Sequence, residues 1–226
     1  MVFPLISEEA YDALLEKNAY YFEELRRIVL EKGEGLEGNC FFMHMYAGGP
    51  DPRLKTKQMN LYSAAAVADS VLEIGFNAGH SCFLFLLANP TSKIVCFDLG
   101  THAYVKPCAD YLDRLFPGRL TLILGDSRST VPKYRLQHAD WNLTKEGGVE
   151  HFDLVHVDGG HEEAVANADF WNTYPMLKKG GTLIWDDTHS ELLNDLCEKY
   201  MDDGLIKEQT HIYPTYMYPH RMFNKV

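Results

Sequence analysis

Two short segments in the second half of the chain contain residue types that bind metal ions and move protons. Asp158 directly follows one short apolar segment, and Asp186 and Asp187 directly follow the next one. If both segments are neighbouring strands of a parallel sheet, their carboxyl ends meet at one crevice and the three carboxylates converge there. Like charges repel unless a cation lies between them, and an all-oxygen environment suits a hard divalent ion such as Mg²⁺. The pattern therefore predicts Asp158, Asp186 and Asp187 as metal ligands, around an ion that binds two substrate oxygens and acidifies one of them.

A histidine follows the first of these acids. His161 lies about one helical turn beyond Asp158 in the sequence. A neutral imidazole at this place can accept the proton of a hydroxyl, so we interpret His161 as a general base and Asp158 as its catalytic neighbour. His189, just beyond the acid pair, competes for the role of base. A plainer interpretation stays open, in which Asp158 is a turn residue, His161 begins a helix and the acid pair caps another helix.

A glycine turn lies earlier in the chain, within residues 73–81. Gly75 and Gly79 allow the backbone to approach a ligand closely, and the helix after them directs its N-terminal amides at an anion. Phe76 and Asn77 follow Gly75, so the turn does not have the dinucleotide pattern G-x-G-x-x-G, which disfavours a dehydrogenase. Such turns also occur for steric reasons alone, so the glycines by themselves do not establish a cofactor site.

Two further acids stand where later strands are expected to end. Asp98 comes 23 residues after Gly75, close to the ~20 residues at which an acid binds ribose hydroxyls in nucleotide-binding α/β folds. Asp126 and Ser127 follow the next apolar segment, where they can hydrogen-bond an adenine amino group. The alternatives are a helix N-cap or solvated acid for Asp98 and a plain Asx turn for Asp126.

Short apolar segments that alternate with helical periodicity must position these residues. We expect strands over residues 71–74, 93–98, 120–124, 152–158 and 181–186, and two closing strands over 206–212 and 221–226. We expect helices over residues 8–31, 54–68, 81–88, 103–116, 162–178 and 190–202, with Pro175 interrupting the fifth. Ser7, followed by Glu8 and Glu9, predicts the N-cap of the first helix. This order predicts an α/β fold with a doubly wound, mostly parallel seven-stranded sheet and N-terminal helices.

Length and composition limit the classes of protein. The chain has 226 residues, 46% of them hydrophobic and 23% charged, which predicts one globular domain over residues 1–226. Within it, residues 1–69 form an N-terminal helical segment and residues 70–226 the cofactor-binding and catalytic core. The formal net charge of −11 argues against nucleic acid as a partner. We expect a cytoplasmic protein, because no apolar run is long enough for a membrane span and the N-terminus lacks the pattern of a secretion signal.

Cysteine usage agrees with an intracellular location. The five cysteines are widely spaced and form no C-x-x-C pair. Such a scattered, odd-numbered set predicts neither a disulfide framework nor a cysteine zinc site. Cys82 and Cys96 lie inside apolar stretches, so we expect these two to be buried thiols.

Across residues 70–190 the chain resembles the class I S-adenosylmethionine-dependent methyltransferases. Its D-G-G-H and D-D segments are similar to those of the Mg²⁺-dependent sugar O-methyltransferases of the macrocin and mycinamicin kind and of relatives of cephalosporin hydroxylase. The resemblance implies a Rossmann-like methyltransferase fold, with Asp158, Asp186 and Asp187 on the metal and His161 as base. It also implies that S-adenosylmethionine lies against the glycine turn and the strand-end acids. The residues expected to contact this cofactor are Glu73, Gly75, Phe76, Asn77, Gly79, Ser81, Asp98, Asp126 and Ser127.

The resemblance implies an O-methyltransferase that acts on a sugar hydroxyl of a small-molecule or glycan acceptor. Two other interpretations stay open: methylation of a catechol or another phenol, and a non-catalytic cofactor-binding module in a glycan-processing assembly. Residues 39–60 and 137–150 are expected to shape the acceptor pocket. A homo-oligomer is compatible with the sequence.

Overall fold

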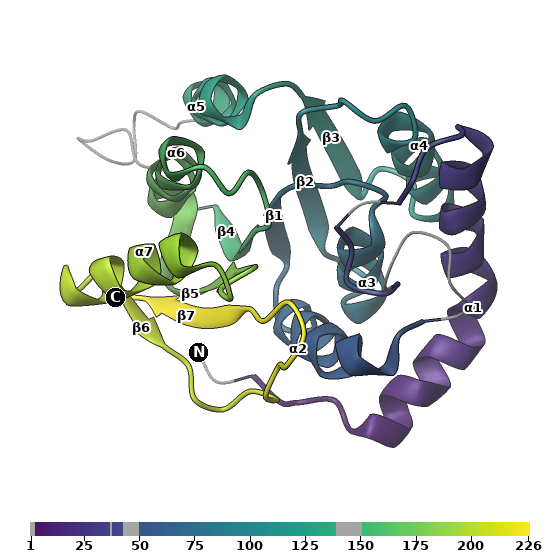
Figure 1. The fold of residues 1–226 in the computed structure, drawn as a ribbon, viewed down its shortest axis with the longest axis horizontal. Coiled ribbons are helices and arrows are strands. Elements are labelled where there is room, and N and C mark those ends of the chain that lie inside the picture. The colour runs from purple at the N-terminus through teal and green to yellow at the C-terminus, as the bar shows by residue number, and fades with distance from the viewer. Residues whose placement is uncertain (1–2, 37, 43–49, 139–150) are drawn as a thin grey trace.

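The computed structural model describes residues 3–36, 38–42, 50–138 and 151–226, and these residues form a seven-stranded sheet (Figure 1). The strands are β1 (Ser70–Ile74), β2 (Lys93–Asp98), β3 (Leu120–Leu124), β4 (Phe152–Val157), β5 (Leu177–Trp185), β6 (Ile206–Glu208) and β7 (Arg221–Lys225). Their order in the sheet is β3-β2-β1-β4-β5-β7-β6. The first five strands pair in parallel, and β7 pairs antiparallel with both β5 and β6. The predicted fold class is therefore confirmed, including the two closing strands.

Helices cover both faces of this sheet (Figure 1). On one face lie α1 (Glu8–Glu31), α2 (Lys55–Ala65), α3 (His80–Ala88) and α4 (Val105–Leu115). On the other face lie α5 (Ser127–His138), α6 (Glu163–Thr173) and α7 (Glu191–Asp202). Two 3₁₀ helices, η1 (Pro52–Leu54) and η2 (Tyr174–Met176), precede α2 and follow α6. The N-terminal helices predicted from the sequence are present as α1 and α2.

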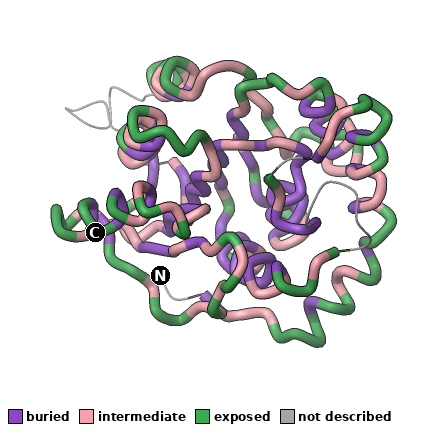
Figure 2. Tube along the Cα trace, in the orientation of Figure 1, coloured by how far each residue is buried: buried purple, intermediate pink, exposed green. Residues whose placement is uncertain are grey.

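Alternating side chains of the strands build a core on each face. In β1, Val71 packs in the cluster beneath α1–α4, whereas its neighbour Leu72 packs in the cluster beneath α5–α7. In β4, likewise, Leu154 packs beneath α1–α4 and Val155 packs beneath α5–α7. Because helices cover both faces, the central strands are buried through most of their length, as Figure 2 shows. The carboxyl ends of these strands are thus held rigidly at one edge of the sheet.

The first helix begins at its predicted cap. The Ser7 hydroxyl accepts a hydrogen bond from the amide of Ala10 at 3.2 Å. Along the helix, Tyr11, Phe22 and Leu25 are buried in the cluster that covers the first face of the sheet.

Two elements differ from the prediction. No helix was predicted after the third strand, yet α5 occupies residues 127–138; it is largely polar, buries Val131 and contains Pro132. The predicted helix over 162–178 ends at Thr173, because Pro175 leads into η2 and strand β5 already begins at Leu177. Both differences leave the strand ends that carry the acids in place.

The cysteines and helices agree with two further expectations. All five cysteines are buried free thiols. Among the described residues, no helix combines the length and apolar character that crossing a bilayer requires.

A buried histidine at the start of α3 makes the stability of the fold sensitive to acid. His80 lies among the rings of Phe22, Phe41 and Phe42, and neither of its ring nitrogens has a hydrogen-bond partner. Burial lowers the pKa of His80 to about 3. The His80 side chain therefore stays neutral in the folded state at pH values where the unfolded chain, with a pKa near 6.5, is already protonated. The free energy of unfolding is therefore unaffected by His80 above pH 6.5 and falls as the pH decreases from there toward 3.

We expect the His80→Phe variant to lose less stability than the wild type between pH 6.5 and 4, a window of about 2.5 units below the ordinary histidine pKa. Each unit contributes up to about 1.4 kcal/mol to the difference in unfolding free energy between the two proteins. Urea unfolding across this range measures it, and above pH 7.5 the difference should stop changing with pH (roughly one unit above that pKa). Parallel pH profiles for the two proteins would contradict the assignment.

Candidate active site

The glycine turn after β1 has the geometry that only glycine permits at two positions. Gly75 has φ +93° and Gly79 has φ +78°, both in the left-handed region. A Cβ on Gly75 would lie 2.0 Å from the carbonyl oxygen of Asp158. The backbone after β1 and the backbone after β4 thus touch each other, which brings the glycine turn and the acid segment together.

The Gly75→Ala variant is expected to lose about 2 to 5 kcal/mol of unfolding free energy, from left-handed strain and from the displaced backbone. Gly118→Ala is the matched control, because Gly118 has φ +67° but no atom within 4 Å of the added Cβ. The control should lose only the strain, about 1 to 2 kcal/mol. Thermal unfolding of both variants measures the difference. Equal losses would show that the contact between the turn and Asp158 is unimportant.

A cleft of about 250 Å³ opens beside this turn. It is lined by Gly38, Asn39, Cys40, residues 75–81 and Asp158. Asn77 fixes the rim: its side-chain amide donates to the carbonyl of Gly38 at 2.7 Å and accepts from the Tyr104 hydroxyl at 2.7 Å.

Five of the residues predicted to contact the cofactor line this cleft: Gly75, Phe76, Asn77, Gly79 and Ser81. The ring of Phe76 is buried beneath the turn, so this residue contributes mainly its backbone to the cleft.

Asp98, at the end of β2, is attached to the same turn. One of its carboxylate oxygens accepts the amide of Asn77 at 2.7 Å, and the other accepts the amide of Gly100 at 2.7 Å. A carboxylate has about four lone-pair sites, so two remain for the hydroxyls of a ligand. Asp98 thus has the position and the remaining acceptors that its predicted role requires.

Glu73 and the acid after β3 are placed differently. Glu73 is fully buried, and its carboxylate accepts from the Ser81 hydroxyl and the Cys96 thiol and pairs with His156. It belongs to the interior network beneath the turn and does not line the cleft.

Asp126 pairs with the Arg128 guanidinium at 2.6 Å and accepts the Arg128 amide at 2.9 Å. Hydrogen bonds from Arg128 lower the pKa of Asp126. Asp126 therefore caps α5, and neither it nor Ser127 lines the cleft or the pocket described below.

The acid at the end of β5 is the centre of a buried charged network. Asp186 is 2% exposed, and one of its oxygens lies 2.6 Å from the ammonium of Lys57, on α2. Its other oxygen lies 3.3 Å from Nε2 of His156, whose Nδ1 lies 3.1 Å from Glu73. The side chains of Lys57, Asp186, His156 and Glu73 thus contact one another in series across the interior.

This network separates the acidities of the two strand-end aspartates. Burial opposes the charged form of His156, but hydrogen bonds to Asp186 and Glu73 outweigh this effect. Burial also opposes the charged form of Asp186, but the charge of Lys57 and the hydrogen bond to His156 outweigh it. The pKa of His156 rises to about 10, and that of Asp186 falls below its usual range. Burial and the charge of Asp186 instead raise the pKa of Asp158 to about 8. The two strand-end aspartates therefore differ in acidity, with Asp186 the stronger acid.

Asp187 joins this network to the predicted base. It has φ +53°, and its amide donates to Asp186 at 2.8 Å. One of its carboxylate oxygens lies 2.9 Å from Nε2 of His161, and the other lies 3.7 Å from Nδ1 of His189. Asp187 therefore contacts His161 at hydrogen-bond distance, whereas His189 lies farther from it.

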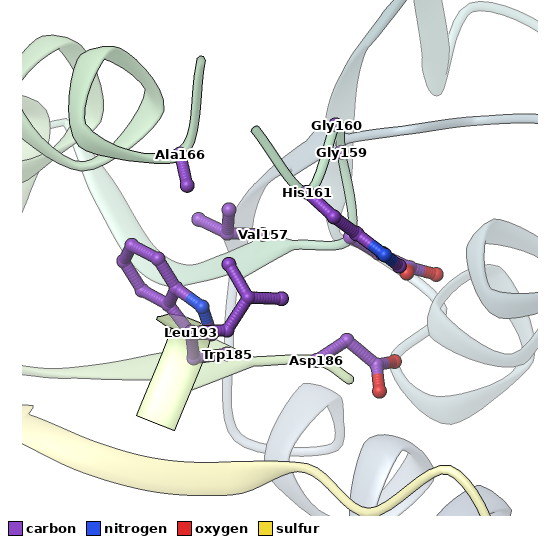
Figure 3. A pocket seen from close by; sticks show the side chains of 9 residues that line it. Val157, Gly159, Gly160, His161, Ala166, Trp185, Asp186 and Leu193 are labelled. Carbon is purple, nitrogen blue, oxygen red and sulfur yellow. The ribbon is translucent and has the colours of Figure 1, made fainter. Parts of the chain in front are cut away.

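A second pocket, of about 200 Å³, lies on the other side of Asp158. Figure 3 shows Val157, Ala166, Trp185 and Leu193 on one side of it, and the side chains of His161 and Asp186 on the other. Asp158 lines both this pocket and the cleft beside the glycine turn. Of the segments expected to shape an acceptor pocket, residues 43–49 and 139–150 lie outside the described residues.

The donor atoms fit a divalent ion only in part. Those of His156, Asp158 and Asp186 lie within 4.8 Å of one another. Asp187, predicted as the third ligand, is not in this group and instead contacts His161. Moreover, Asp186 already contacts a protein cation, Lys57. The metal site predicted from the three aspartates remains a prediction.

Sequence reasoning missed Lys57 and His156. His156 sits inside an apolar strand, where an isolated histidine predicts only a buried side chain, and Lys57 lies 129 residues before its partner. The local sequence contains no signal for Lys57, because α2 begins with the polar residues Lys55, Thr56, Lys57 and Gln58, and nothing in this run distinguishes a buried lysine from an exposed one.

Comparison with solved structures agrees with this fold. The O-methyltransferase from Bacillus cereus, solved with SAH, has a TM-score of 0.65 at 14% identity and covers 90% of this chain and 89% of that one. The methyltransferase PaMTH1 of Podospora anserina, also bound to SAH, has a TM-score of 0.61 at 14% identity, covering 100% and 99%. A TDP-rhamnose 3'-O-methyltransferase of calicheamicin biosynthesis has a TM-score of 0.57 at 20% identity, covering 74% and 76%. No curated protein sequence matches the chain.

Identities this low support the fold alone. The family relationship rests on residues 72–188, which match the family described as a methyltransferase domain. This segment is just over half of the chain and extends from β1 to the residue after Asp187. The chain belongs to this methyltransferase family.

Proposed function

We propose that this protein is an S-adenosylmethionine-dependent O-methyltransferase whose acceptor is a hydroxyl group of a small molecule or glycan, with a sugar favoured. The observation that carries the proposal is the position of Asp158, which lines both the cleft beside the glycine turn and the pocket that contains His161. A cofactor in the first cavity and an acceptor in the second would meet at this residue.

The cofactor supplies an electrophilic methyl group when bound. The turn residues that line the cleft would hold it, together with the free acceptor sites of Asp98. The two solved relatives described with SAH have the same fold. They support the choice of cofactor.

His161 would remove the proton of the acceptor hydroxyl. Its Nε2 faces Asp187, and an N–H at this nitrogen that donates to the carboxylate leaves Nδ1 unprotonated. Nδ1 can then accept the hydroxyl proton as the oxygen takes the methyl group. Half of the His161 side chain is exposed, so an acceptor can reach it from solvent.

Two observations bear on the acceptor. One solved relative is a TDP-rhamnose 3'-O-methyltransferase, and the sequence resembles sugar O-methyltransferases. The apolar wall of the second pocket, which includes Trp185, would also accept a phenol. We favour the sugar because of the sequence resemblance, and the phenol is the second candidate.

The carboxylates of the site also need a positive charge close to them. A divalent ion can provide it, as the sequence predicts, and so can the ammonium of Lys57.

Transfer of a labelled methyl group from S-adenosylmethionine tests the proposal. Rhamnosyl and hexosyl acceptors and catechol should be assayed side by side, each with Mg²⁺ and with a chelator. Turnover on a glycosyl acceptor above that on catechol is expected, and the reverse order would favour the phenol. Binding of SAH without turnover on any acceptor would instead favour the non-catalytic module.

A further inference from the structure

The ammonium of Lys57 lies beside the cluster of three aspartates, Asp158, Asp186 and Asp187, whose negative charges need a cation nearby. Its side chain is 6% exposed, and its Nζ lies 2.6 Å from Asp186 and donates to the carbonyl of Tyr218 at 3.0 Å. Helix α2 is buried around most of its circumference, so the lysine cannot turn toward solvent without moving the helix. The ammonium is thus a permanent part of the interior.

This charge changes what else the cluster can bind. Lys57 interacts electrostatically with all three aspartates of the predicted metal site, Asp158, Asp186 and Asp187. A divalent ion bound to the same carboxylates would lie close to a buried ammonium, in surroundings where like charges repel strongly. The ammonium of Lys57 and a metal ion would therefore compete for the same carboxylate, that of Asp186.

Lys57 is also connected to the predicted base by direct contacts. The Asp186 oxygen that contacts Lys57 Nζ also accepts the amide of Asp187 at 2.8 Å. This hydrogen bond from the Asp187 amide holds Asp187 in its left-handed conformation, and the Asp187 carboxylate contacts His161 at 2.9 Å. The position of the imidazole thus depends on an oxygen that Lys57 fixes.

We propose that the ammonium of Lys57 takes the place of a divalent cation in this site and acts as a positioning residue for the Asp187–His161 pair. The catalytic part of this inference rests on the proposed function. The binding part does not, because it concerns only which cation the carboxylates hold. Methyl transfer by this chain would accordingly need no added metal.

Titration with Mn²⁺, followed by calorimetry, tests the binding part on the wild type and on Lys57→Gln. The wild type should show no Mn²⁺ binding that depends on Asp186. Lys57→Gln removes the charge and retains most of the side-chain length, so it should gain Mn²⁺ binding, and the additional change Asp186→Asn should abolish that gain. Lys55→Gln, on the same helix, is the matched control, because Lys55 pairs with Glu8 and Asp12 at the surface and should leave metal binding unchanged.

Activity measurements test the catalytic part. Turnover of the wild type should survive a chelator, whereas kcat of Lys57→Gln should fall roughly 10- to 100-fold, as displacement of a catalytic group does, at unchanged affinity for SAH. Mn²⁺ binding to the wild type that Asp186→Asn abolishes would overturn the proposal, and so would an unchanged kcat in Lys57→Gln. If Lys57→Gln does not fold, the wild-type titration and the chelator assay decide. If SAH binds but no acceptor is methylated, the proposed function fails while the wild-type Mn²⁺ titration still identifies the cation.

Discussion

The His161→Ala variant is expected to transfer methyl groups roughly 100- to 10,000-fold more slowly than the wild type, the range over which a general base contributes to catalysis. The reason is its contact with Asp187, which orients the ring and leaves one nitrogen to accept a proton. His161 does not line the cleft beside the glycine turn, so the affinity for SAH should not change. Single-turnover rates with a saturating acceptor measure the first quantity, and calorimetry measures the second.

His189→Ala is the matched control for this prediction. His189 lies on the same carboxylate but at 3.7 Å, and it is exposed to a similar degree as His161. Its removal should lower the rate far less. A larger loss in His189→Ala than in His161→Ala would transfer the role of base to His189.

The Asp98→Ala variant is expected to lose affinity for SAH by about 2 to 4 kcal/mol, roughly 30- to 1,000-fold, because hydrogen bonds to a charged acceptor are each worth about 1.5 to 3 kcal/mol. Two losses add here. The ligand hydroxyls lose their acceptor, and the amides of Asn77 and Gly100 lose the carboxylate that fixes the turn.

Asp126→Ala is the control for Asp98, because it removes another strand-end acid that pairs with Arg128 at the surface and does not line the cleft. Its affinity for SAH should remain within a few-fold of that of the wild type. Asp98→Asn retains one acceptor oxygen and should fall between Asp98→Ala and the wild type. Equal affinities of Asp98→Ala and Asp126→Ala would remove Asp98 from the cofactor site.

The strands of this fold could be predicted because a strand buried on both faces is a short run of consecutive apolar residues. Val71 and Leu72 are both apolar, as a strand covered by helices on each side requires, and the same holds for Leu154 and Val155. Helix α5 could not be predicted in this way. It buries only Val131, contains Pro132 and has almost no apolar periodicity, so its position is set by tertiary contacts.

The candidate site was predictable to the extent that topology determines it. Parallel strands place their carboxyl ends at one edge, so Asp98 and Asp158 lie beside the glycine turn and Asp186 lies in the same pocket as Asp158. The partner of each acid was not predictable. Lys57 reaches Asp186 from a helix on one face of the sheet, and nothing in the local sequence of either residue identifies the other.

Glu73 illustrates the same limit. The family resemblance implied that Glu73 contacts the cofactor, but a strand side chain can point into the interior as well as toward the crevice. Here it points inward, where Ser81, Cys96 and His156 satisfy it.

The central claim, that the glycine cleft binds the methyl-transfer cofactor, is tested most directly by calorimetric titration of the folded wild-type protein with SAH. One SAH should bind per chain with micromolar affinity, and the affinity should be the same in a chelator as in Mg²⁺. A wild-type protein that is folded by circular dichroism and binds no SAH would contradict the claim, and the glycine turn would then be an architectural feature only.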